Sequence, residues 1–199
     1  MSTSRRNAIK RAITLSVGGM AFARSSVSIA QAFPNKPIRL VVPYAAGGAV
    51  DTVSRLVGGR IAERLGQPVL VDNRPGASTN IGMQQVAKGP ADGYTLLMAS
   101  NTLATNAALF SSLGFDPAND FIPIAKIGYA PLVLVVPSTS PYDTLPKLVA
   151  AARSEPGKII YGSAGNGSSG HLAAEQLGRA AGVEFLHVPY KGGAQALKI

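Results

Sequence analysis

The chain has 199 residues, no cysteine, two histidines and a formal net charge of +9. The absence of cysteine excludes disulfides, thiolate metal sites and a cysteine nucleophile. The two histidines, His171 and His187, lie sixteen positions apart. That spacing is not typical of a metal site, so we expect no metal.

Residues 1–32 are typical of an export signal. A basic segment containing Arg5-Arg6 precedes a short apolar stretch, 12–23, and a small-x-small cleavage site at Ala30-Gln31-Ala32. The arginine pair resembles a twin-arginine signal, and an ordinary secretory signal is the alternative. The apolar stretch is shorter than the roughly 20 residues that span a bilayer. We therefore predict cleavage near Ala32 and a periplasmic protein.

Much of the positive charge lies in this signal. Residues 1–32 hold five basic residues and no acidic ones, which lowers the net charge of the remaining chain from +9 to +4. No basic cluster with interleaved aromatic residues remains, so we expect no nucleic acid as a partner. A mild positive charge suits a small anionic ligand.

Beyond the signal, short apolar runs alternate with amphipathic ones. We predict strands over 38–43, 69–73, 95–99, 121–129, 132–137, 159–162 and 185–189, and helices over 50–65, 80–88, 102–109, 145–154, 168–181 and from 192 onward. This alternation is typical of an α/β fold with a mostly parallel sheet.

Two glycine-rich turns each join a predicted strand to a predicted helix, at residues 41–51 and 161–171. Glycine lets the backbone approach a ligand closely, and a helix that begins after the turn adds its positive dipole end. Two such turns suggest two sides of one anion-binding cleft.

In the first turn, the backbone N–H groups of Ala46, Gly47 and Gly48 are candidates to bind a carboxylate. Tyr44 follows the strand and fits either a pocket wall or the core. Asp51 is expected to cap the following helix, because its charge would repel a bound anion.

Two further candidates follow the next strands. Thr79 begins a helix and fits either a cap or the cleft, and Asn101 follows a strand end, where ligands of α/β proteins gather. Arg74 is expected to form a structural salt bridge in preference to a ligand contact.

In the second turn, Ser163, Gly167, Ser168 and Ser169 are candidates to hold a carboxylate. His171, at the start of the next helix, could donate a hydrogen bond to the ligand or add charge when protonated. Its alternative role is packing at the helix start.

The second turn also matches a different pattern. Gly165-x-Gly167-x-x-Gly170 fits the dinucleotide fingerprint, so the alternative function is an exported NAD-binding oxidoreductase. Glu184 follows the glycine motif at a shorter spacing than the usual ribose-binding acid, and it begins its strand instead of ending it. Both features argue against the NAD-binding interpretation. The sequence has neither a GxSxG motif nor a Walker A motif.

Five segments, 34–51, 71–82, 91–97, 162–171 and 187–197, occur in an order that resembles the tripartite tricarboxylate transporter receptors, also called Bug receptors. The resemblance implies a type II periplasmic binding-protein fold with two α/β lobes and a cleft between them. We expect lobe 1 at 33–131 and lobe 2 at 132–199, the second lobe being incomplete in this chain.

The same resemblance implies the function. Such a receptor binds a small carboxylate without a cofactor and without catalysis, and delivers it to the membrane subunits of a tripartite tricarboxylate transporter. The resemblance adds Tyr190, in a third strand-to-helix turn, to the ligand-binding residues. We expect a monomer.

Overall fold

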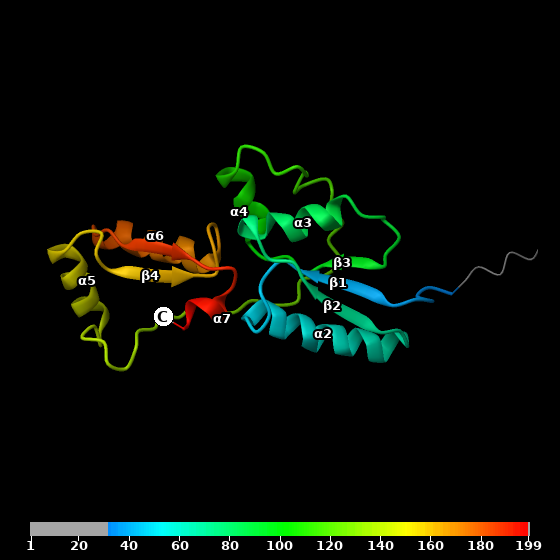
Figure 1. Ribbon diagram of the computed structural model, residues 1–199, viewed down its shortest axis with the longest axis horizontal. Helices are drawn as coiled ribbons and strands as arrows, with labels where there is room; N and C mark the ends of the chain where they lie inside the picture. Colours follow the sequence, from blue (N-terminus) through cyan, green and yellow to red (C-terminus); the bar gives the residue numbers. More distant parts are fainter. Residues whose placement is uncertain (1–31, 199) are drawn as a thin grey trace, which may run out of the picture. The chain divides into compact units, whose positions relative to one another are not determined.

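The computed structural model describes residues 32–198, in which the strands form two separate parallel sheets (Figure 1). The predicted export signal lies outside the described residues apart from Ala32. None of the described helices combines the length and the apolar character that crossing a membrane requires.

The first sheet has the strand order β2-β1-β3, with β1 at Ile38–Val42, β2 at Val69–Asn73 and β3 at Thr95–Leu97. Its central strand is an apolar run in which Ile38, Val41 and Val42 are almost fully buried. A strand covered on both faces needs apolar residues on both faces, which explains why every residue of β1 except Arg39 is apolar. The carboxyl end of β1 therefore emerges from the centre of this sheet.

Three helices accompany the first sheet: α2 at Ala49–Leu65, α3 at Asn80–Ala87 and α4 at Thr102–Leu109. Figure 1 shows α2 and α3 on opposite sides of the sheet. Right-handed crossovers to the two sides of β1 require this arrangement. A short 3₁₀ turn, Ala77–Thr79, precedes α3.

The second sheet pairs β4, Ile160–Ser163, with β5, Leu186–Pro189. The crossover between them is α6, Ser169–Ala181, and α5, Leu145–Ser154, comes before β4. A final short helix, α7, covers Gly193–Ala196. The expected boundary between lobes at residue 131 stays a prediction, although the two sheets lie on either side of it in sequence.

Most predicted elements form, but the two strands expected at 121–129 and 132–137 do not. This segment has no strand partner among the described residues, and its apolar side chains are exposed, Tyr129 at 92% and Ile122 at 88%. The alternation of apolar residues is real, but a β-strand exists only where its backbone groups pair with a neighbour. The prediction of two strands is therefore wrong for this structure.

Two adjacent glycines in α2 allow a test of how this helix packs. A Cβ at Gly58 would lie 3.2 Å from Val69 Cγ1, whereas a Cβ at Gly59 would meet nothing within 4 Å. We predict that Gly58→Val lowers the free energy of unfolding by about 1–3 kcal/mol through overpacking. Gly59→Ala should raise it by about 0.5–1 kcal/mol through helix propensity.

Urea denaturation of the two variants measures both effects. Equal effects of the same sign would contradict the close approach of α2 to β2.

Candidate functional site

The first glycine-rich turn connects the end of β1 to the start of α2. Gly47 has a φ of +84°, a conformation that favours glycine, and Gly48 is the N-cap of α2. No side chain caps this helix, and the N–H groups of Ala46, Gly48 and Ala49 have no hydrogen-bond acceptor within residues 32–198. The turn therefore presents free donors at the positive end of a helix dipole.

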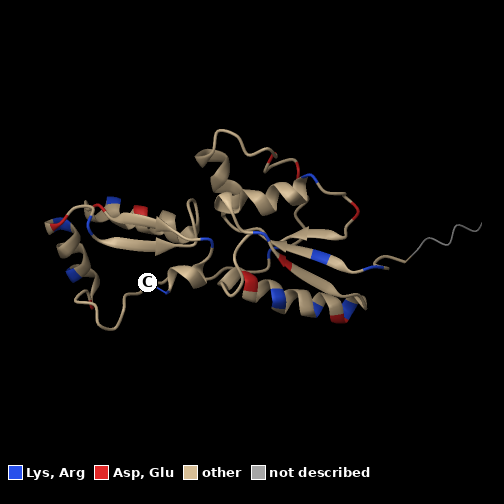
Figure 2. Cartoon of the chain, viewed as in Figure 1, with Lys and Arg blue, Asp and Glu red and all other residues tan. Residues whose placement is uncertain are grey.

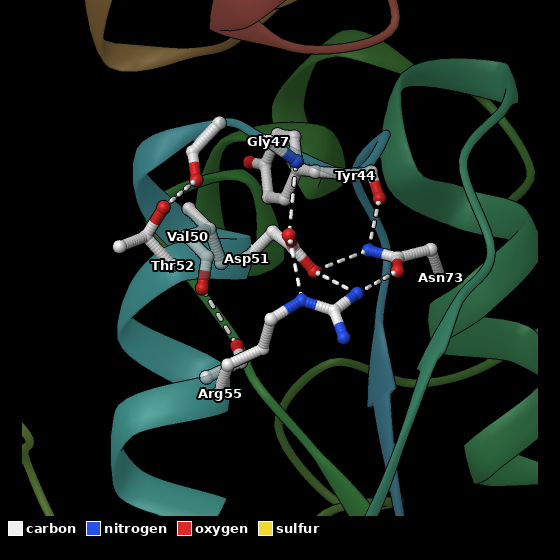
Figure 3. A network of polar contacts seen from close by, with 9 residues as sticks. Tyr44, Gly47, Val50, Asp51, Thr52, Arg55 and Asn73 are labelled. Carbon is white, nitrogen blue, oxygen red and sulfur yellow. Dashed lines mark hydrogen bonds and ion pairs between the residues drawn. The ribbon is translucent and has the colours of Figure 1, made fainter.

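The N–H of Gly47 is different, because Asp51 occupies it. Asp51 Oδ2 accepts a hydrogen bond from Gly47 N at 2.9 Å (Figure 3). The expectation that Gly47 offers its N–H to a ligand is therefore not met. Asp51 also does not cap α2 in the expected way: it lies in the first turn and reaches back beyond the N-cap.

Arg55 and Asn73 complete the surroundings of this carboxylate. Arg55 Nε lies 3.0 Å from Asp51 Oδ2, and Asn73 Nδ2 donates to Asp51 Oδ1 at 2.9 Å. The bond from Arg55, with those from Gly47 and Asn73, outweighs burial and lowers the pKa of the Asp51 carboxyl to about 2. Asp51 is therefore ionised at neutral pH.

A cluster of hydroxyl groups lies behind the turn. Tyr44 Oη lies 2.6 Å from Ser100 Oγ and 3.0 Å from Thr102 Oγ1, and Thr79 Oγ1 donates to Thr102 Oγ1 at 3.0 Å. Tyr44, Thr79 and Thr102 are buried. Tyr44 is thus part of the core with its hydroxyl satisfied, and Thr79 joins the same network.

The backbone before α3 is strained. Ala77, Ser78 and Thr79 all have positive φ, at 44°, 51° and 79°. Asn106 Nδ2 holds this segment by donating to Ser78 O at 2.7 Å. Non-glycine residues with strained backbones cost free energy and cluster at functional sites. The strained segment next to the hydroxyl cluster therefore supports a functional site in this region.

The second glycine-rich turn is also held by side chains. Ser168 is the N-cap of α6, and its hydroxyl accepts from His171 N at 3.4 Å. Gly167 N donates to His171 Nδ1 at 3.1 Å. His171 therefore accepts a hydrogen bond from the turn through Nδ1, and only its Nε2 is left for the donation that the sequence analysis expects.

Ser163 is buried at the end of β4. Its Oγ lies 2.7 Å from His187 Nε2 and 3.1 Å from Gly165 O. The His187 ring stacks on that of His171 with 4.2 Å between centroids. Burial and the neighbouring His171 both lower the pKa of His187, which favours its neutral form.

The second turn makes direct contact with the start of α4. The carbonyl oxygen of Gly167 accepts from Asn101 Nδ2 at 2.8 Å and from Thr105 Oγ1 at 2.9 Å. Ser169 Oγ donates to Asn101 Oδ1 at 2.8 Å. The structure thus places Asn101 next to the candidate residues of the second turn. Both the nitrogen and the oxygen of its side-chain amide are engaged there.

The third turn lies against the first. Lys191 O accepts from Ala45 N at 2.9 Å, and a Cβ at Gly192 would lie 3.4 Å from Ala45 Cβ. Tyr190 is half-buried next to this contact, and its N–H donates to Ser163 O. The segments predicted to line the cleft therefore lie close to one another.

The spacing of the glycines in the second turn has a packing explanation. A Cβ at Gly167 would lie 2.7 Å from Leu109 Cδ1 and 3.1 Å from Asn106 Oδ1, and a Cβ at Gly165 would lie 3.2 Å from Tyr190 O. Close approach to α4 and to the third turn requires glycine at both positions. The dinucleotide interpretation is not needed to explain the pattern.

The side chains near the turns include few charges. No charged residue occurs in α3, α4, α7, β3, β4 or β5, which Figure 2 draws in tan. The charges of β1 and β2 are Arg39 and Asp72, which pair with each other. Arg74 forms the expected structural salt bridge, with Nε 2.9 Å from Asp72 Oδ1. Within residues 32–198, no group of three or more His, Asp or Glu residues could hold a metal ion.

The sequence analysis missed Arg55, Thr105 and Asn106 as residues that shape the site. Arg55 and Thr105 each lie four residues after a candidate, Asp51 and Asn101. Residues four apart share a helix face, so this periodicity was the signal that could have found them.

Comparison with known proteins identifies the family. Residues 53–199 match the family model described as the tripartite tricarboxylate transporter family receptor. A UPF0065 protein from Pseudomonas sp. (strain P51) is 43% identical over 166 residues, which are 83% of this chain and 49% of the relative. The chain thus spans about half the length of that relative.

Solved structures show the same fold. R. palustris Rpa4515 with adipate has a TM-score of 0.81 and 40% identity, and covers 83% of this chain and 56% of its own. The periplasmic binding protein BugD has a TM-score of 0.72 and 32% identity over 83% and 56%. MatC from Rhodopseudomonas palustris with bound malate has a TM-score of 0.74 and 30% identity over 83% and 57%. The predicted type II periplasmic binding-protein fold is confirmed.

Gly167 and Gly182 provide a matched test of the packing explanation. Both have positive φ, +74° and +64°, but a Cβ at Gly182 would meet nothing within 4 Å. We predict that Gly182→Ala costs about 1–2 kcal/mol of unfolding free energy for the left-handed conformation alone. Gly167→Ala should cost a further 1–3 kcal/mol, roughly, for overlap with α4.

Urea denaturation compares the two alanine variants directly. If they were equally destabilised, contact with α4 would not be the reason for glycine at position 167.

Proposed function

Since the chain belongs to the tripartite tricarboxylate transporter receptor family, we propose that it is a periplasmic receptor that binds a small carboxylate and passes it to a membrane transporter of that type. The observation that carries the proposal is the uncapped start of α2, where the N–H groups of Gly48 and Ala49 have no acceptor in the described chain. Free N–H groups at a helix start bind anions.

The chemistry of the surroundings supports a carboxylate held mainly by neutral donors. The hydroxyl of Ser168 lies at the start of α6, a second helix dipole, and the nearby helices α3, α4 and α7 carry no charge. The hydroxyl of Ser169 donates to Asn101 Oδ1 in this structure and would have to turn to reach a ligand. Recognition then comes from backbone N–H groups, hydroxyls and bridging water instead of arginine side chains. Solved relatives hold adipate and malate, which are both small carboxylates.

Delivery of the ligand to a transporter fits a receptor with two lobes. A ligand that contacts both lobes favours the closed state, and closure gives the transporter a signal to recognise. Ser163 lies 2.7 Å from His187 Nε2, but no carboxylate among residues 32–198 is hydrogen-bonded to that ring, so we propose a receptor in preference to an enzyme. We retain the monomer as the proposed state.

Ala49→Pro tests whether the start of α2 binds the ligand. Ala49 is the first residue of α2, where proline is tolerated, and Gly48 before it has the extended conformation (φ −82°, ψ 173°) that a residue preceding proline prefers. The variant removes one N–H that no described group uses. We predict unchanged stability and about tenfold weaker binding of adipate or malate, the effect of one hydrogen bond to a charged group.

Isothermal calorimetry measures the affinities, with Ala49→Ser as the control that keeps the N–H group. Unchanged affinity in Ala49→Pro would exclude this helix start from the site. Micromolar binding of NAD, abolished by Gly167→Ala, would favour the oxidoreductase over the receptor.

Export gives an independent test. If residues 1–32 are a cleaved signal, the protein in the periplasm begins near Phe33. We expect N-terminal sequencing of the periplasmic fraction to show this start. A cytoplasmic protein that retains Met1 would contradict the proposed location.

A further inference from the structure

Asp51 is the only charged side chain that is buried among residues 32–198, with 3% of its surface exposed. A buried charge is costly unless each oxygen is paired. Here Oδ2 accepts from Gly47 N and Arg55 Nε, and Oδ1 accepts from Asn73 Nδ2. Three partners on two segments thus converge on one carboxylate directly behind the first turn.

We infer that Asp51 is a positioning residue of the ligand site: its carboxylate ties down Gly47 N–H and so leaves the N–H groups of Gly48 and Ala49 to a ligand anion. This inference rests on the proposed function. It assigns the specificity of the turn, since a rigid turn with an occupied donor at Gly47 and free donors on either side of it fits a carboxylate group in one orientation.

Asn73 extends the effect to the other end of the turn. Its Nδ2 donates to Tyr44 O at 3.0 Å as well as to Asp51, and its Oδ1 accepts from Arg55 Nη2 at 3.0 Å (Figure 3). The carboxylate is thereby coupled to the carbonyl of Tyr44 and to the N–H of Gly47. A change at Asp51 moves both ends of the turn at once.

Arg55 has a separate, electrostatic task. A ligand anion at the start of α2 would be repelled by the charge of Asp51 in the first turn of the same helix. Salt would screen this repulsion little, because the two charges would be closer than the Debye length. Arg55 lies 3.0 Å from Asp51 Oδ1 and cancels that charge. Arg55 therefore supports anion binding through Asp51.

The experiment begins with the ligand-free chain. We expect hydrogen exchange by NMR to show a protected Gly47 amide, with exchange about tenfold faster in Asp51→Ala, since a hydrogen bond to a charged acceptor is lost. Glu63→Gln is the matched control: it removes an exposed acid from the same helix, away from the turn. Unchanged exchange at Gly47 in Asp51→Ala would overturn the inference.

Adipate binding gives the second readout, at pH 7 by calorimetry. We expect about tenfold weaker binding in Asp51→Ala. Arg55→Gln should bind several-fold more weakly than the parent, and the double variant Asp51→Asn/Arg55→Gln should recover part of that loss. A purely structural role would give losses that follow the unfolding free energy, with the double variant weakest, and that result would overturn the inference.

Two arrangements keep the test decisive. If Asp51→Ala does not fold, Asp51→Asn replaces it, because it keeps the shape and loses the charge. If the parent chain binds neither adipate nor malate, the proposed function fails, while exchange at Gly47 still decides whether Asp51 positions the turn.

Discussion

A carboxylate can be buried only where donors satisfy both of its oxygens, and the turn after β1 is organised around this requirement for Asp51. Gly47 supplies a backbone donor, Asn73 an amide from the end of β2, and Arg55 a charge from the next turn of α2. The left-handed conformation at Gly47 allows its N–H to point at the Asp51 side chain in the first turn of the helix. Burial of β1 at the centre of its sheet fixes where this turn begins.

In the second turn, neutral side chains satisfy the backbone groups of Gly167. The carbonyl of Gly167 is shared by Asn101 and Thr105, and its N–H is accepted by an imidazole nitrogen of His171. In this arrangement His171 Nδ1 is an acceptor, whereas the acceptor in the first turn is the carboxylate of Asp51, whose pKa is lowered to about 2. The first turn is therefore held by a charged acceptor, and the second by a ring nitrogen.

The proposed carboxylate recognition rests on the first turn, where the N–H groups of Gly48 and Ala49 have no acceptor among residues 32–198. The solved relatives with adipate and malate hold ligands of this chemistry on the same fold, although the chain covers little more than half of those proteins. The surroundings contribute hydroxyls and few charges. In the proposed receptor, selectivity among carboxylates depends on which donors are free and where they are fixed, more than on net charge.

Local patterns in the sequence determined the elements, and only the tertiary structure decided their contacts. The helices at Thr102–Leu109 and Leu145–Ser154 and the strand at Val69–Asn73 have the predicted bounds, because apolar periodicity and end signals are local.

Segment 121–137 has the same apolar character but forms no strand, since strand pairing depends on a neighbour that its own residues cannot specify. The sequence likewise located both glycine-rich turns as candidate anion sites. That Asn73 joins the carboxylate of Asp51, and that α4 packs against Gly167, follows from residues far apart in the chain meeting in space, which no local pattern encodes.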